Sequence, residues 1–107
     1  MQNADKRITP VAYLENLVRL LASLDVAQAE NLGQQLLAVR ERNGTVWVLG
    51  NGGSQANAAH LVLHLREAKL KAHDLMEGLP TLSALSNDTS YQAAPMNQLR
   101  SLGSIGD

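Results

Sequence analysis

Residues 46–60 read VWVLGNGGSQANAAH. An apolar run from Val46 to Leu49 meets a glycine-rich turn at residues 50–54, and an alanine-rich run then ends at His60. Bulky and β-branched residues without alternation are typical of a strand that is buried on both faces, as in a parallel sheet. The stretch therefore predicts a β-strand over residues 45–49, a tight turn, and a helix from about Ser54 to Ala68.

The glycine-rich turn has a composition suited to binding an anion. Glycine lets the backbone turn tightly and approach a ligand, and free amides at a helix N-terminus favour negative charge. Ser54 can cap the helix or contact a phosphate oxygen, and Asn51 can both donate and accept hydrogen bonds. The turn has neither the GK[ST] ending of a nucleotide P-loop nor the GxGxxG dinucleotide pattern. Two interpretations stay open: an anion-binding loop, or a strand–helix turn capped by Ser54 with no ligand.

Two helices are predicted before this stretch. Thr9 suits an N-cap and Pro10 the first helical position, and apolar residues then recur at helical spacing over residues 11–24. Asp25 can cap a second helix with its apolar stripe over residues 26–39, and Gly44 would supply its stop.

The remaining sequence predicts one further strand and two short helices. Residues 70–75 (LKAHDL) predict the strand, residues 80–85 a short helix, residues 86–90 (SNDTS) a polar loop, and a last helix is expected beyond Pro95. The order ααβαβαα indicates an α/β fold in a chain of 107 residues, enough for one small domain.

Composition limits the classes of function. The net charge is −1 and the nine basic residues are scattered among acids, which disfavours a nucleic-acid groove. No apolar segment approaches about 20 residues, so no membrane span is expected, and the N-terminus lacks the apolar stretch of a signal peptide. With no cysteine in the chain, these features favour a cytoplasmic location.

The segment GNGGSQANAAH after VWVL resembles the signature of the sugar isomerase (SIS) domain. More narrowly, it is similar to the phosphoheptose isomerase branch, which converts sedoheptulose 7-phosphate to a heptose phosphate. SND at 86–88 matches that branch's Asn-Asp pair, and QLRSLGSIGD resembles the segment that leads to its third strand. The resemblance implies a partial SIS-type three-layer αβα fold with parallel strands, preceded by two N-terminal helices.

The resemblance also implies a division of the chain. Residues 1–43 would form a helical pair for oligomerisation, since helices of this region build the centre of a tetramer in that branch. Residues 44–107 would form the first half of a SIS domain and stop before the third strand, without the Ser/Thr-rich phosphate loop and the distal Gln and His. We therefore expect a homo-oligomer, dimer or tetramer, and an apolar strand edge completed by a C-terminal half chain, another protein or a second copy.

The resemblance assigns roles to individual residues by position. Sugar-phosphate contacts fall on Asn51, Gly52, Gly53, Ser54, Asn87 and Asp88. His60 matches a metal-ligand histidine of that branch, usually for zinc. His64 stands where the branch has a Glu that serves as metal ligand and catalytic base.

The two histidines have a chemistry of their own. They are four residues apart, so they share one helix face, where two imidazoles can hold a metal or one can act as a base. A structural or solvent-facing pair is the alternative. His73, with no motif around it, is expected to be structural.

Three functions remain open at this stage. The first is a phosphoheptose-isomerase-like enzyme. The second is a non-catalytic SIS protein, similar to the family member that associates with the bacterial replication initiator. The third is a small structural module whose leading helices drive oligomerisation. Isomerisation needs a base, a carbonyl polariser and a phosphate anchor held together, so residues 1–107 alone are expected to be inactive.

Overall fold

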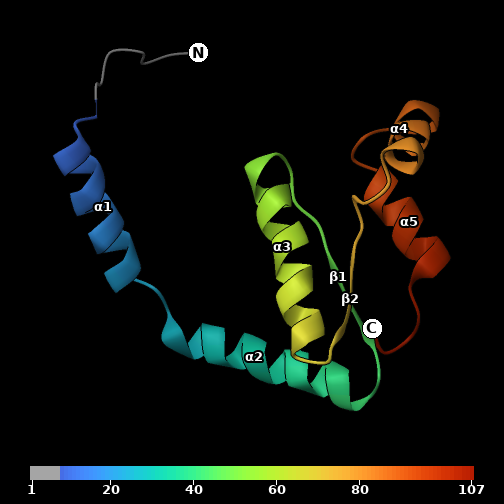
Figure 1. Cartoon of the computed structure of the whole chain (residues 1–107), viewed down its shortest axis with the longest axis horizontal. Helices are drawn as coiled ribbons and strands as arrows, with labels where there is room; N and C mark the ends of the chain where they lie inside the picture. Colours follow the sequence, from blue (N-terminus) through green and yellow to red (C-terminus); the bar gives the residue numbers. More distant parts are fainter. Residues whose placement is uncertain (1–7) are drawn as a thin grey trace. The chain divides into compact units, whose positions relative to one another are not determined.

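A computed structural model describes residues 8–107, so residues 1–7 of the predicted helical pair lie outside the described residues. The described chain contains seven elements in the predicted order (Figure 1): α1 (Pro10–Ala22), α2 (Val26–Glu41), β1 (Thr45–Val48), α3 (Gly53–Glu67), β2 (Lys71–Asp74), α4 (Leu79–Asp88) and α5 (Ala94–Leu102). The chain forms two compact units, of which one ends at Asn31 and the other spans Leu32–Asp107. This division falls inside α2, and the domain boundary expected after residue 43 stays a prediction.

The first unit holds α1 and the start of α2, and both helices begin at the predicted caps. The Thr9 hydroxyl accepts a hydrogen bond from the Ala12 amide at 3.1 Å, with Pro10 in the first turn. The Asp25 carboxylate accepts one from the Gln28 amide at 3.1 Å. The apolar stripe of α1 is exposed, with Leu14 at 58% and Leu21 at 59%.

The end of α2 differs from the prediction that Gly44 supplies the stop. Asn43 adopts the left-handed conformation, with φ of 59°, and the Gly44 amide then donates to the Val39 carbonyl at 2.9 Å. Asparagine takes this helix-ending position because its short polar side chain tolerates positive φ.

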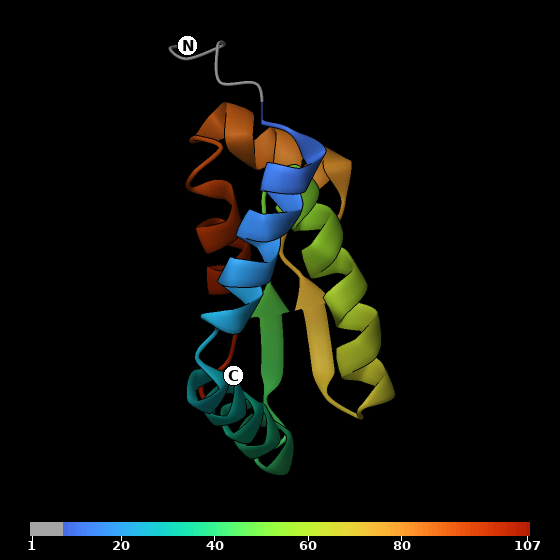
Figure 2. The ribbon, with the colours of Figure 1, turned by 90° about the vertical axis from the view of Figure 1, so that its left-hand side faces the viewer.

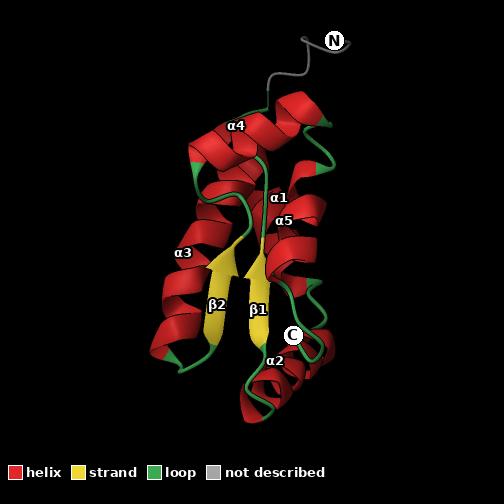
Figure 3. Ribbon diagram, turned by 90° about the vertical axis from the view of Figure 1, so that its right-hand side faces the viewer, coloured by secondary structure: helices red, strands yellow, loops and turns green. Residues whose placement is uncertain are grey.

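The two predicted strands pair in parallel, as Figures 2 and 3 show by the direction of their arrows. The register joins Thr45 to Lys71 and Val48 to Asp74. All four residues of β1 are half-buried, so the expected burial on both faces is met only in part. The architecture is a partial α/β fold, and the complete three-layer arrangement stays a prediction.

The core lies between the sheet and α3. Val62, Leu65, Leu70 and Ala72 form it, with Leu36 of α2 and two valines of β1, Val46 and Val48, packed against it. Burial of these aliphatic side chains stabilises the packing of α3 against the two strands. The helix α5 runs on the opposite side of the strands from α3 (Figure 1).

The prediction of a polar loop over residues 86–90 is wrong for its first half. Ser86, Asn87 and Asp88 form the last turn of α4, and the chain leaves the helix at Thr89. The polar composition suggested a loop, but Asn87 and Asp88 are exposed, and polar residues are common on the solvent side of a helix.

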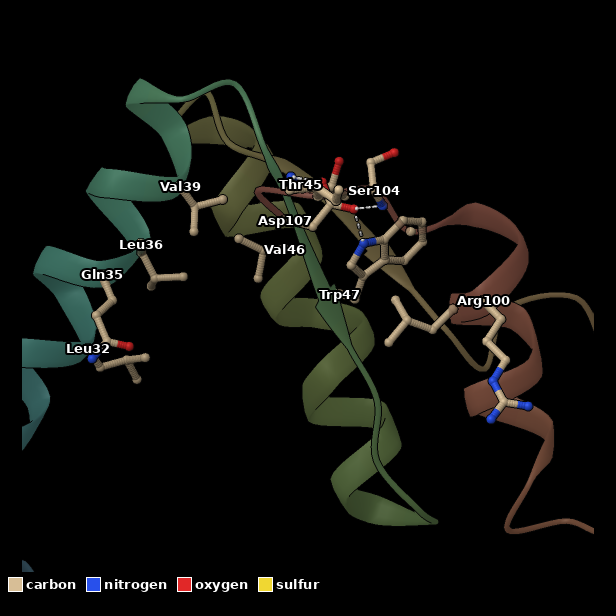
Figure 4. Close-up of a pocket in the computed structure, with 13 residues that line it drawn as sticks. Leu32, Gln35, Leu36, Val39, Thr45, Val46, Trp47, Arg100, Ser104 and Asp107 are labelled. Atoms are coloured by element: carbon tan, nitrogen blue, oxygen red, sulfur yellow. Dashed lines mark hydrogen bonds between the residues drawn. The ribbon is translucent and has the colours of Figure 1, made fainter.

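The edge of β1 opposite β2 is bordered by the segment 104–107, and no strand within residues 8–107 pairs with it. One oxygen of the Asp107 carboxylate accepts from the Thr45 amide at 3.0 Å. The other accepts from the Trp47 indole at 2.9 Å and the Ser104 amide at 2.8 Å (Figure 4). These hydrogen bonds lower the pKa of Asp107 from its ordinary 3.8, and the bond from the Trp47 indole has the largest effect.

A groove of about 690 Å³ runs along this edge. Its lining comes from the second half of α2, from β1 and from residues 99–107 (Figure 4). The apolar strand edge expected from the sequence is thus present, with a carboxylate at one end of it.

Candidate functional site

The glycine loop follows the carboxyl end of β1 and leads into α3, and two of its glycines are required by geometry. A β-carbon on Gly50 would lie 2.5 Å from the carbonyl carbon of Ser54. Gly52 is the N-cap residue, with φ of 59° and ψ of −123°, a conformation that costs other residues strain. The loop can therefore form only with glycine at these two positions.

Ser54 does not cap the helix, contrary to one interpretation of the sequence. No side chain caps α3, and Ser54 is the second helical residue. The Ser54 amide donates to the Asn51 carbonyl at 3.1 Å, and the Gln55 amide to the Gly52 carbonyl, also at 3.1 Å. The turn itself satisfies these donors, which removes the need for a serine cap.

The outer side of the loop is open. A β-carbon built on Gly52 or Gly53 would meet no atom within 4 Å. Within residues 8–107 the amides of Gly52 and Gly53 have no hydrogen-bond acceptor. A ligand could therefore approach this stretch of backbone closely.

Gln55 holds the loop by side-chain hydrogen bonds, a role that no local sequence pattern indicates. Its side-chain oxygen accepts from the Gly50 amide at 2.8 Å, and its amide nitrogen donates to Asp74 at 2.5 Å. The second Asp74 oxygen accepts from the Met76 amide at 2.8 Å. This chain of bonds ties the loop to the carboxyl end of β2.

Tyr91 is a second residue that sequence reasoning did not find. It lies in the turn between α4 and α5, and its hydroxyl donates to the Asn51 side-chain oxygen at 2.7 Å. The contact joins residues 40 positions apart and brings that turn to the glycine loop.

Asn87 and Asp88, the other predicted substrate contacts, lie exposed at the end of α4. Within residues 8–107 neither side chain is hydrogen-bonded to the loop. Their role in binding, like that of the loop residues, stays a prediction.

His60 and His64 share a face of α3, as their spacing predicts, with ring centroids 4.7 Å apart. The buried face of α3 consists of Ala58, Val62 and Leu65. At 100° per residue the histidines project from the opposite side of the helix. His64 Nδ1 lies 3.1 Å from a Glu67 oxygen, and these side chains are 58% and 63% exposed.

The two imidazoles alone do not make a zinc site, because zinc takes at least three protein ligands. Within residues 8–107 no group of three His, Cys, Asp or Glu side chains is placed to hold a metal. Zinc binding through His60 and His64 would need a ligand from outside this set.

His73 packs against Trp47, with ring centroids 5.3 Å apart and planes inclined by 30°. The two rings stack although His73 is exposed, and the structural role expected for His73 stays a prediction.

Comparison with curated proteins finds a consistent set of relatives. The chain is 34% identical over 101 residues to "Probable phosphoheptose isomerase" of Thermoplasma volcanium, a match that covers 89% of this chain and 52% of that protein. The chain matches about half the length of proteins of the phosphoheptose isomerase family.

Other members agree with this assignment. The phosphoheptose isomerase of Helicobacter pylori is 30% identical over 103 residues, covering 91% of this chain and 53% of its own length. The phosphoheptose isomerase of Paramagnetospirillum magneticum is 37% identical over 70 residues, a match that covers 60% of this chain and 36% of that protein. The chain spans about half the length of the first two relatives. No protein-family model and no solved structure matches the chain.

Among the helices of residues 8–107, none has both the length and the apolar character needed to cross a membrane.

Proposed function

We propose that this protein binds a sugar phosphate at its glycine loop, residues 50–54, and takes part in the isomerisation of sedoheptulose 7-phosphate to heptose 7-phosphate, a precursor of lipopolysaccharide heptose. The observation that carries the proposal is the match to proteins named phosphoheptose isomerase over about nine-tenths of the chain. The open backbone of the loop supports it from the structural side.

The phosphate would lie against Gly52 and Gly53. Their amides lack an acceptor within residues 8–107, and the positive end of the α3 dipole adds to the attraction for an anion. The Ser54 hydroxyl and the Asn51 amide would serve the phosphate or the sugar hydroxyls, with Asn87 and Asp88 as further contacts.

The chemistry of isomerisation requires a base beside the carbon that loses its proton. His64 would be that base by position, with His60 beside it. Helical rise sets His60 about 10 Å along the axis from Gly53, on the same side of α3, so a sugar chain anchored at the loop would extend toward the histidines. Zinc, if bound there, would polarise the substrate carbonyl.

A second candidate is sugar-phosphate binding without catalysis, in a protein that acts through a partner. One observation favours it: the His64 imidazole points away from the core of this unit and contacts Glu67 in solvent. In this candidate the loop keeps its ligand and the histidines have no role in chemistry.

The test is a titration of the chain with sedoheptulose 7-phosphate, followed by amide chemical shifts. We expect the Gly52, Gly53 and Ser54 signals to move, with a dissociation constant near millimolar, about −4 kcal/mol. Shifts elsewhere but not at these residues would show that the loop is a structural turn only.

An activity assay tests whether residues 1–107 catalyse the isomerisation on their own. We expect no turnover by residues 1–107, with or without zinc, and no rescue by His64→Glu, because these residues bring together only a partial anchor and two imidazoles. Turnover that is lost in His64→Ala would contradict this expectation and establish His64 as a base.

A further inference from the structure

We propose that Tyr91 is a positioning residue of the glycine-loop site, which it serves by fixing the orientation of the Asn51 side chain. The inference rests on the proposed function, because it concerns how the same site recognises the sugar part of its ligand. Tyr91 lies outside the GNGGS and SND segments, in a turn that the sequence alone does not connect to the loop.

The hydrogen bond between the two side chains determines which group Asn51 can offer. A carboxamide has one accepting oxygen and one NH₂ group with two donors. The Tyr91 hydroxyl occupies the oxygen at 2.7 Å. The NH₂ group, which has no acceptor within residues 8–107, is left to donate to a ligand oxygen.

Tyr91 is itself held by the start of α5. The Ser90 hydroxyl accepts from the Ala93 amide at 3.1 Å, and Ala94 is buried to 1% exposure at the first helical position. The turn that carries Tyr91 is therefore anchored, and it can hold Asn51 in place with little loss of its own freedom.

The glycine loop is thus fixed from two sides. Gln55 holds Gly50 from the side of β2, and Tyr91 holds Asn51 from the side of the α4–α5 turn. Between these points lie Gly52 and Gly53, which are open. Such an arrangement preorganises the donors for a ligand, which reduces the entropy lost on binding.

The contact contributes little to the fold itself. Tyr91 is 48% exposed and Asn51 is exposed, and a hydrogen bond between two exposed groups competes with water. Its loss should therefore change ligand binding more than stability.

The loop offers two kinds of hydrogen-bond donor, and each kind suits a different part of a sugar phosphate. The backbone amides of Gly52 and Gly53 suit a phosphate, whereas the Asn51 NH₂ group suits a hydroxyl or carbonyl oxygen of the attached sugar. Removal of the Tyr91 hydroxyl should therefore weaken sugar-phosphate binding more than binding of inorganic phosphate.

The experiment compares the 107-residue chain with its Tyr91→Phe variant, and uses Tyr13→Phe as the matched control. Tyr13 lies in α1, is 60% exposed, and loses the same hydroxyl far from the loop in sequence. Each protein is titrated with sedoheptulose 7-phosphate and with inorganic phosphate, and the Asn51 side-chain NH₂ signals are recorded by NMR.

We expect Tyr91→Phe to raise the dissociation constant for sedoheptulose 7-phosphate about 3- to 10-fold, the range for one lost hydrogen bond. Inorganic phosphate should be affected less than about 2-fold. The free Asn51 NH₂ signals should move in Tyr91→Phe and not in Tyr13→Phe, and the unfolding midpoint should be unchanged in both.

Two outcomes would overturn the inference in distinguishable ways. In the first, the amide signals of Gly52–Ser54 move when the unmodified chain is titrated, and Tyr91→Phe binds sedoheptulose 7-phosphate with the same dissociation constant. Tyr91 then has no positioning role, and the proposed function stands. If the unmodified chain shows no shift at Gly52–Ser54 with either ligand, the proposed function fails and the inference with it.

Discussion

At the scale of single residues, Gly50 and Gly53 have opposite requirements although they are three positions apart. A β-carbon at Gly50 would lie 2.5 Å from the Ser54 carbonyl carbon, whereas one at Gly53 would meet nothing within 4 Å. We expect Gly50→Ala to lower the free energy of unfolding by about 1–3 kcal/mol. Gly53→Ala should leave it unchanged or raised by up to about 1 kcal/mol, since alanine favours a helix.

Urea unfolding measures the two stabilities, and the same proteins are titrated with sedoheptulose 7-phosphate. Gly53→Ala should bind more weakly because its methyl group occupies the open side of the loop. A Gly53→Ala variant that is stable and binds as tightly as the unmodified chain would exclude close approach of the ligand to this backbone.

The Asp107 carboxylate predicts a pH dependence at the edge of β1. Its folded pKa lies below the ordinary value of 3.8, chiefly because the Trp47 indole donates to it. A carboxylate with a lowered folded pKa stabilises the fold above the unfolded pKa, and this contribution is lost as pH falls through the lowered folded value. The Trp47 indole N–H signal should therefore shift with a midpoint below 3.8, and in Asp107→Asn this titration should disappear.

Some residues could be assigned from the sequence and others could not, for a physical reason. Thr9 and Asp25 cap helices through amides three residues away, so a local pattern predicts them. Gln55 and Tyr91 act on partners 19 and 40 positions away, and no local pattern contains such a contact. Ser54 matched a capping pattern, but the conformation of Gly52 satisfied the turn without it.

At the scale of elements, the first two helices were predictable because their apolar residues recur at helical spacing, and β1 was predictable because a continuous apolar run meets a glycine-rich turn. The parallel pairing of β1 and β2 was likewise expected from a strand–helix–strand order. The end of α4 was not, since Asn87 and Asp88 are as compatible with an exposed helical turn as with a loop.

The link between the glycine loop and β2 is tested by substitution of Gln55. Gln55→Ala removes two part-buried hydrogen bonds and should lower the free energy of unfolding by about 1–3 kcal/mol. Gln55→Glu should be similarly harmful, because its carboxylate would face that of Asp74. Gln34→Ala, at an exposed position of α2, is the control and should be neutral. If the free energy of unfolding is unchanged in both Gln55 variants, the hydrogen bonds of Gln55 to Gly50 and Asp74 do not contribute to stability.

At the scale of the whole molecule, the exposed stripe of α1 predicts self-association. Leu14, Val18 and Leu21 lie on one side of the helix and are each more than half exposed. We expect a homo-oligomer at micromolar concentration in sedimentation experiments, because exposed apolar patches of this kind mark interaction surfaces. Leu14→Glu with Leu21→Glu should dissociate it, while Asn16→Glu on the opposite side should not. A folded monomer of the unmodified chain would contradict this prediction.

The contacts of the segment 104–107 have a consequence for the order of folding events. Arg42 donates to the Gly106 carbonyl, and Thr45 and Trp47 donate to Asp107, across sequence separations of 60 to 64 residues. Contacts this distant require closure of a long loop, whose entropy cost must be met before they form. They should therefore form after the transition state of folding. Asp107→Asn is then expected to accelerate unfolding of the unit Leu32–Asp107 and to leave its refolding rate nearly unchanged.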